Sequence, residues 1–271
     1  MSIFAYDFMR RALVAAVLVG LAAPAIGTFL VQRRLSLMGD GIGHIALTGV
    51  ALGFLLGTAP VLTAIVVAIV GAIAIELVRE RGRASGDVAL ALLFYGGIAG
   101  GVLLIGLSPG GTPGALVGYL FGSLSNVTTS DLAIIVGLGV AVLAIVAVFA
   151  RELFAVCQDE EVARVSGLPV RFLNILVAVT AAVTVTVAMR VVGLLLVSAL
   201  MVVPVATTQQ LTRSFRTTLL GACALGATAS VGGLVMAFYL DVAPGAATVV
   251  LALGVFLVFV LLGGARRAVA R

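Results

Sequence analysis

Residues 10–57 read RRALVAAVLVGLAAPAIGTFLVQRRLSLMGDGIGHIALTGVALGFLLG, which is two apolar runs separated by a polar break around Arg33 and Arg34. Each run approaches the roughly 20 residues that an α-helix needs to cross the hydrocarbon core of a bilayer. Neither run shows the sustained alternation, with a period of two, that is typical of a membrane barrel. The stretch therefore predicts two consecutive transmembrane helices.

The same pattern continues along the chain. Of its 271 residues, 62% are hydrophobic and only 10% are charged, whereas a soluble domain carries about a quarter of charged residues. We predict an all-α polytopic membrane protein with about eight or nine transmembrane helices in a single domain, 1–271. The first run, from Leu13 to Val31, is longer than a signal-peptide core, so we expect it to be a retained helix. Candidate spans are 10–31, 38–57, 60–79, 87–107, 131–150, 172–189, 191–210, 217–239 and 245–264.

One apolar segment, from Pro113 to Leu124, is too short to cross the bilayer. Turn-forming residues bound it on both sides. A re-entrant or interfacial half-helix is the interpretation that satisfies its backbone polar groups.

The basic residues, all sixteen of them arginine, predict the orientation. All but Arg10, Arg11 and Arg190 fall on one side of the membrane when the nine spans are threaded in order. Because short cytoplasmic loops are enriched in basic residues, that side is expected to be the cytoplasm. The N-terminus is then outside and the C-terminus inside. An eight-span arrangement, with one span broken or tilted, stays open because Arg10 and Arg11 would prefer the other side.

Asp40 and His44 are the candidate metal ligands. They lie four residues apart on a predicted helix and therefore share one face. A carboxylate oxygen with an imidazole nitrogen suits zinc, manganese or iron, and two ligands alone suit a transient site on a transport path. The alternative is structural: Asp40 would cap the helix and His44 would satisfy a local hydrogen bond.

The longest predicted cytoplasmic connection, about residues 151–171, is a candidate docking loop for a partner protein. Asp159 is a suitable N-cap, acidic residues follow it, and Gly167 before Leu168 and Pro169 is a suitable C-terminal stop. A short helix is expected here, with Val162, Val165 and Leu168 as an apolar face; an ordinary surface connector is the alternative. The docking residues are Asp159, Glu160, Glu161, Val162, Ala163, Arg164, Val165, Ser166, Gly167 and Leu168.

Glycine spacing predicts close helix packing. Gly49 and Gly53 repeat every four positions, which lets another helix approach closely, either within the chain or in a second copy. Pro204 lies within a predicted span and permits a kink there. Arg190, just before that span, is expected to extend to the outer interface.

Several motifs are absent from the chain. It contains no GxxxxGK[ST] for ATP, no HExxH and no GxSxG. We therefore expect a transport protein and no catalytic residues. A stand-alone secondary transporter of a small metabolite, an intramembrane enzyme and a non-transporting scaffold stay open as alternatives.

Taken together, several segments resemble the ABC-transporter permeases that import zinc, manganese and iron. Residues 33–49 resemble that family's R-x-x-x-x-GD-x-x-SHA-x-x-PG segment. Residues 190–204 are similar to its R-x-VG-x-LLV-x-A-x-x-x-x-P segment, and 241–248 to its D-x-P-x-GA-x-x segment. Gly122–Ser123 with Asp131–Leu132 resembles its FGS…SDL segment, and Gly167–Leu168 its docking loop. The similarity runs nearly end to end in one order.

The resemblance implies a homodimeric permease in a bacterial plasma membrane. It implies a fold similar to that of the larger cobalamin and siderophore importers, with fewer helices. Its implied partners are a cytoplasmic ABC ATPase, an external metal-binding protein, a second copy of the chain and membrane lipid; no nucleic acid is expected. No permanently bound cofactor is implied, since the divalent zinc, manganese or iron ion is cargo.

The resemblance also implies that Asp40 and His44 lie on the metal path. Two positions depart from the family pattern beside this pair: Gly43 stands where the family has Ser, and Thr48 where it has Pro. Which metal is carried does not follow from the ligand types, because oxygen and nitrogen donors in small number suit all three.

Overall fold

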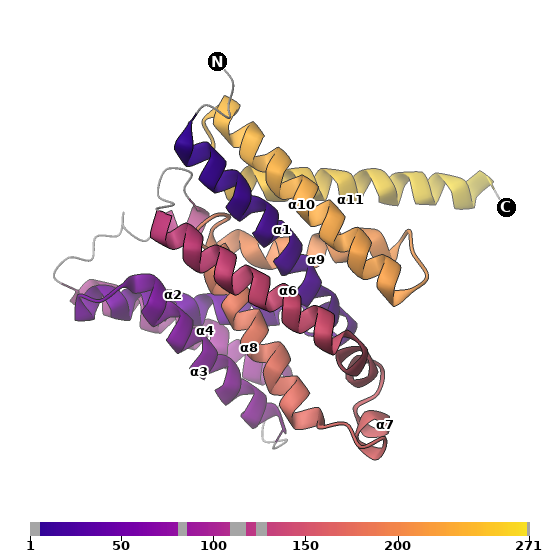
Figure 1. Cartoon of the computed structure of the whole chain (residues 1–271), viewed down its shortest axis with the longest axis horizontal. Coiled ribbons are helices and arrows are strands. Elements are labelled where there is room, and N and C mark those ends of the chain that lie inside the picture. The colour runs from indigo at the N-terminus through magenta and orange to yellow at the C-terminus, as the bar shows by residue number, and fades with distance from the viewer. Residues whose placement is uncertain (1–5, 81–85, 109–117, 123–128, 270–271) are drawn as a thin grey trace.

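The computed structural model describes residues 6–80, 86–108, 118–122 and 129–269, and these parts of the chain are helices joined by short connections (Figure 1). A short helical turn, residues 118–121, lies between α4 and α6. The predicted half-helix from Pro113 to Leu124 otherwise falls outside the described residues. The helices are α1 (Asp7–Gln32), α2 (Met38–Leu56), α3 (Pro60–Glu80), α4 (Gly86–Leu107), α6 (Thr129–Gln158), α7 (Glu160–Val165), α8 (Val170–Ala188), α9 (Leu194–Gln209), α10 (Phe215–Leu240) and α11 (Pro244–Val269).

Eight of these helices are long and apolar enough to cross a membrane, which confirms the predicted all-α, multi-span fold class. The predicted span at 191–210 differs from the rest. The chain turns between Met189 and Gly193, where Gly193 has a φ of +90°, and α9 starts only at Leu194. This leaves α9 with 16 residues, and Pro204 lies inside it.

Helix α6 continues past its predicted end at residue 150 and reaches Gln158. No glycine or proline interrupts residues 151–158, and Leu153 and Val156 are buried against the other helices. Burial of these apolar side chains therefore stabilises the helix beyond the charged pair Arg151–Glu152. The predicted docking loop, about 151–171, is shorter than expected and starts at Asp159.

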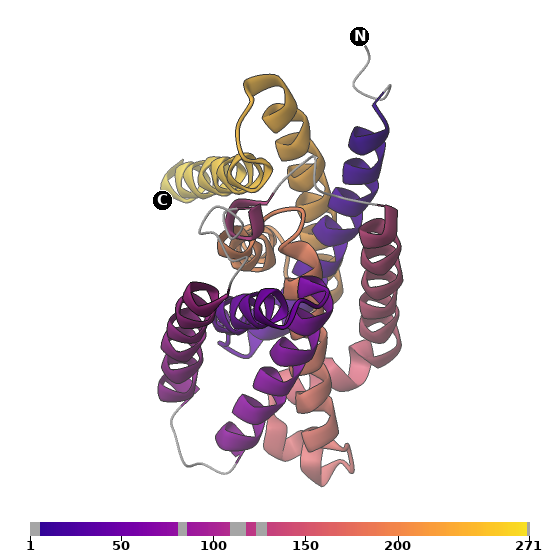
Figure 2. The ribbon, with the colours of Figure 1, turned by 90° about the vertical axis from the view of Figure 1, so that its left-hand side faces the viewer.

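The centre of the fold is α1, which packs against α10, α6, α9 and α8 (Figures 1 and 2). Small residues allow the close approach: a Cβ added at Gly27 would lie 2.1 Å from the Met201 carbonyl oxygen of α9, and one at Gly20 would lie 2.7 Å from the Ala227 Cα of α10. Helices α1, α2 and α8 are the most buried spans, whereas α3, α4 and α6 are largely uncovered.

Helices α1 and α10 run antiparallel, so their aromatic pairs mark the two ends of the molecule. Tyr6 and Phe238 lie at one end, with ring centroids 6.0 Å apart, and Phe29 and Phe215 at the other, 5.2 Å apart. The second end also carries Arg33, just after α1, and Arg216, in the first turn of α10.

Basic residues gather at this second end, as the predicted topology requires. Ion pairs join Arg33 and Arg79 to Glu160, and Arg171 to Glu80 at 3.1 Å. At the opposite end, Arg10 pairs with Asp7 at 2.7 Å. Arg81, Arg83 and Arg271 lie outside the described residues, as do the side chains of Arg266 and Arg267. Which end faces the cytoplasm stays a prediction.

Candidate functional site

Asp40 and His44 lie in the first half of α2 and face each other. The His44 Nε2 atom is 4.0 Å from the Asp40 Oδ1 atom, and the side chains are 7% and 27% exposed. Residue 37 rather than Asp40 occupies the N-cap position, and no side-chain capping bond is formed there. The structural alternative for Asp40, a helix cap, is therefore not what the structure shows.

The imidazole of His44 is buried and only partly satisfied. Its Nδ1 atom has no hydrogen-bond partner among the described residues, and the ring packs edge-on against Phe94 at 4.3 Å. A buried polar atom without a partner costs free energy. The local hydrogen bond that would give His44 a purely structural role is thus absent from the described part of the chain.

A hollow of about 260 Å³ opens beside the carboxylate of Asp40, between the start of α2 and α4. Its lining is Leu37, Asp40, Gly41, Leu90, Ala91, Phe94 and Tyr95. Within the described ranges, no group of three or more His, Cys, Asp or Glu side chains is placed to hold a metal ion. The pair alone offers one oxygen ligand and one nitrogen ligand, too few for a closed structural zinc site.

The crossing of α2 and α4 places the backbone of α4 directly on His44. A Cβ added at Gly97 would lie 2.6 Å from the His44 carbonyl carbon. Beside it, the Thr48 hydroxyl donates to the Gly97 carbonyl at 2.7 Å. Thr48, which departs from the family pattern, thus supplies a hydrogen bond between the two helices that a proline could not.

Gly43, the other departure, has space around it. A Cβ added there would meet Leu194 and Val185 at 3.4 and 3.6 Å, which is ordinary van der Waals contact. The absence of a side chain at this position therefore does not set the helix packing.

Ser198 is a site residue that the sequence reasoning missed. Its hydroxyl, on α9, donates to Asp40 Oδ1 at 3.3 Å. The available signal was its place in the 190–204 segment, but nothing local indicated which helix that segment would contact. Asp40 thus accepts a bond from α9 and faces His44 on its own helix.

Helix α7 forms where the capping signals predicted it. Asp159 accepts hydrogen bonds from the backbone N–H groups of Glu161 and Val162 at 2.8 and 3.0 Å. At the other end, Gly167 has a φ of +83°, and the Leu168 N–H donates to the Ala163 carbonyl at 3.1 Å. Local chemistry alone explains both ends of the helix.

The apolar face predicted for this helix is split. Val162 and Val165 are 61% and 90% exposed, whereas Leu168 is partly buried against the core and Ala163 is 2% exposed. Leu168 lies after the turn at Gly167, which redirects it inward. The exposed face that a partner could contact is therefore smaller than predicted and centres on Val162 and Val165, with Arg164, Ser166 and Glu161 also exposed.

Gly49 and Gly53 lie against the neighbouring helix of the same chain. Added Cβ atoms would lie 2.6 Å from the Ala64 Cα and 2.6 Å from the Pro60 Cα, both in α3. Pro204 is buried within α9, and the Thr208 hydroxyl donates to its carbonyl at 2.9 Å.

Arg190 does not simply extend toward the outer interface. It forms an ion pair with Asp131, and both side chains are less than a fifth exposed, at 18% and 14%. Its guanidinium also donates to the Tyr119 hydroxyl at 3.2 Å and lies 5.4 Å from that ring's centroid. The pair joins two segments that carry the family resemblance, 190–204 and 131–132, at the end opposite to α7.

Comparison with known proteins identifies a family for the chain. Residues 5–263 match the ABC 3 transport family. The manganese import system permease protein ScaB of Streptococcus gordonii is 33% identical over 93% of this chain and 90% of its own length. The chelated iron transport system membrane protein YfeD of Yersinia pestis is 33% identical over 92% of this chain and 83% of its own.

Solved structures share the fold. A chain of PsaBC from Streptococcus pneumoniae, in complex with Fab, superposes with a TM-score of 0.84 at 34% identity and covers 94% of this chain and 91% of its own. A metal-chelate type ABC transporter in an inward-facing conformation superposes with a TM-score of 0.77 at 17% identity, covering 93% and 85%. The second similarity supports the fold alone. The chain therefore belongs to the ABC 3 transport family and is the membrane-spanning permease subunit of an ABC transporter.

Proposed function

We propose that this permease carries a divalent transition metal, manganese, zinc or iron, into the bacterial cytoplasm past Asp40 and His44. The observation that carries the proposal is the carboxylate–imidazole pair itself, a half-buried Asp40 beside a buried His44, which lies next to a hollow and has an imidazole nitrogen without a partner among the described residues. An ionisable pair inside a membrane span costs free energy, and such pairs are usually retained because they have a function. The manganese and iron systems named for the relatives support this class of cargo.

Two ligands per chain favour a site shared between copies. In a homodimer with the path on its axis, two Asp40–His44 pairs would face one ion and supply four oxygen and nitrogen donors, a number that first-row metals accept. A shared site also opens when the two copies move apart. A transported ion requires such a site, because it must be able to leave.

The energy source and the delivery of the ion come from partners. Since the sequence contains no phosphate-binding loop, we assign ATP hydrolysis to a cytoplasmic ABC ATPase that docks on residues 159–168, chiefly at Val162 and Val165. An external metal-binding protein would present the ion at the opposite end, near Arg190. With the shorter α9 crossing as a ninth span beside the eight longer helices, the N-terminus is outside and the C-terminus inside.

The test is ATP-driven uptake of manganese(II), zinc(II) and iron(II) by the permease reconstituted with its ATPase in liposomes. Asp40→Asn and His44→Gln keep the size and polarity of the side chains but remove the carboxylate and the imidazole. We expect either change to lower uptake by at least about tenfold, because losing one of few ligands removes a large share of the binding free energy.

Asp7→Asn is the matched control, since it makes the same chemical change on a side chain that is 79% exposed. Equal uptake by the Asp40→Asn, His44→Gln and native complexes, at equal protein levels, would remove the pair from the path. Accumulation of metal by the permease without the ATPase would instead support a secondary transporter.

A further inference from the structure

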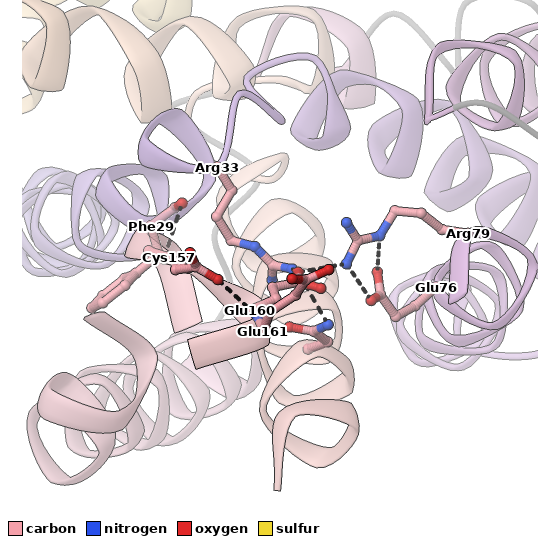
Figure 3. A network of polar contacts seen from close by, with 9 residues as sticks. Phe29, Arg33, Glu76, Arg79, Cys157, Glu160 and Glu161 are labelled. Atoms are coloured by element: carbon pink, nitrogen blue, oxygen red, sulfur yellow. Dashed lines mark hydrogen bonds and ion pairs between the residues drawn. The ribbon is translucent and has the colours of Figure 1, made fainter. Parts of the chain in front are cut away.

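One carboxylate oxygen at the start of α7 joins four helices. The Oε1 atom of Glu160 accepts hydrogen bonds from Arg33, which follows α1, from Arg79 Nη2 of α3 at 3.3 Å, and from Asn174 Nδ2 of α8 at 3.4 Å (Figure 3). Arg33 and Glu160 are 127 residues apart in sequence. A local role, such as capping α7, is already filled by Asp159.

The groups around Glu160 are only partly protected from solvent: Arg79 is 27% exposed and Glu160 itself is 37% exposed. The side chain of Arg33 is 6% exposed, and Arg79 is held by both oxygens of Glu76, at 3.1 and 2.7 Å, where Glu76 itself is 5% exposed. The cluster contains two arginines and two glutamates, so its charges balance. Such a cluster differs from an exposed ion pair, because removing one member leaves a buried charge without its partner.

The charge of Glu160 is maintained in the folded protein. Burial by itself would raise the pKa of this carboxyl, but Arg33 and Arg79 outweigh burial, and the pKa is lowered from its ordinary value. Glu160 is therefore ionised throughout the physiological pH range.

Glu160 bonds α7 to helices other than the two on which α7 mainly packs. The backbone of α7 packs on α6 and α8, which flank it in the chain. The Glu160 side chain adds hydrogen bonds to Arg33, just after α1, and to Arg79 of α3. In turn, α3 packs closely on α2 through Gly49 and Gly53, and α2 carries Asp40 and His44.

We propose that Glu160 is a positioning residue that couples the docking helix α7 to the transmembrane helices α1 and α3, so that movement of the bound ATPase reaches the helix pair around Asp40 and His44. The inference rests on the proposed function, since it takes α7 as the docking site. Without the bonds from Glu160 to Arg33 and Arg79, α7 would move with the ATPase while α1 and α3 stayed in place. ATP would still be hydrolysed, but less metal would be moved for each ATP.

The experiment measures the ratio of manganese(II) transported to ATP hydrolysed by the permease–ATPase complex in liposomes, with the metal presented by its binding protein. Glu160→Gln removes the charge and keeps the shape. Glu80→Gln is the matched control: it makes the same change at the same end of the molecule, on a side chain of similar exposure whose ion pair with Arg171 lies outside the Glu160 cluster and outside residues 159–168. We expect the ratio to fall at least about tenfold for Glu160→Gln and to stay native for Glu80→Gln, with ATPase binding unchanged in both.

A structural role alone would give a different result, namely less complex but a native ratio in the complex that forms. That result, or equal ratios in the two variants, overturns the inference. If Glu160→Gln fails to accumulate, the double variant Arg33→Gln/Glu160→Gln also removes the positive charge of Arg33, which the single change leaves without its partner. The ratio of manganese(II) transported to ATP hydrolysed is then measured on the double variant, with the same expected result. Native complex that shows no ATP-driven uptake would overturn the proposed function instead, which separates the two failures.

Discussion

At the scale of single residues, the chemistry of this permease rests on a few polar groups placed where water is scarce. Ser198 of α9 bonds Asp40, which faces His44 on α2, and Glu160 bonds Arg33 and Arg79 at the end that carries α7. In both places a hydrogen bond or ion pair comes from another helix. A substitution at one of these bonded residues is therefore expected to affect two helices.

Glu160 gives the protein a pH dependence with a definite sign. Because its pKa is lowered on folding from the ordinary value of 4.5, its contribution to stability is present above that value and is lost as the pH falls through the lower, folded pKa. We expect native protein to lose more stability than Glu160→Gln between pH 5 and more acidic values, as measured by thermal unfolding in detergent. Glu161→Gln should follow the native curve, and a Glu160→Gln curve parallel to the native one would contradict the assignment.

At the scale of elements, the crossing of α2 and α4 is the most sensitive contact near the site. Gly97 and Gly96 are adjacent glycines of α4, but only Gly97 meets the backbone of α2; a Cβ at Gly96 has nothing within 4 Å. Gly97→Ala must push α4 away from His44 and strain the Thr48 bond, at a cost of about 1–3 kcal/mol. We expect lower thermal stability and lower metal uptake for Gly97→Ala, and native values for Gly96→Ala. Native behaviour of both would show that α4 is not held against His44.

At the scale of the whole molecule, charge separates two ends: α7 with most described arginines at one, and Asp7, Arg190 and Asp131 at the other. The orientation of the protein in the membrane can be measured by cysteine labelling in a variant in which Cys157 and Cys223 are replaced by serine. We expect a membrane-impermeant maleimide to label Asp7→Cys but not Val165→Cys in intact cells, since both native side chains are well exposed. In inside-out vesicles stripped of the ATPase, which would otherwise cover Val165, the two should exchange. Labelling of Val165→Cys in intact cells would reverse the topology.

Much of the fold follows from local patterns in the sequence. Runs of apolar residues set the number and bounds of the spans, because a helix is the only way for such a run to satisfy its backbone in lipid. Asp159 and Gly167 determine α7 by capping and by positive φ. The shortened α9 and the extended α6 were the exceptions, since a turn at Gly193 and the burial of Leu153 and Val156 depend on neighbouring helices.

The sequence by itself determined a membrane-spanning helical chain, the face shared by Asp40 and His44, and the short capped helix α7, because each of these depends on residues only a few positions apart. Only the tertiary structure decided that Ser198 reaches Asp40, that Arg190 pairs with Asp131, and that Glu160 joins α1 and α3. These contacts join residues far apart in the chain. Glycines on the helix surfaces allow helices to pack closely, but the local sequence does not indicate which helix packs against which.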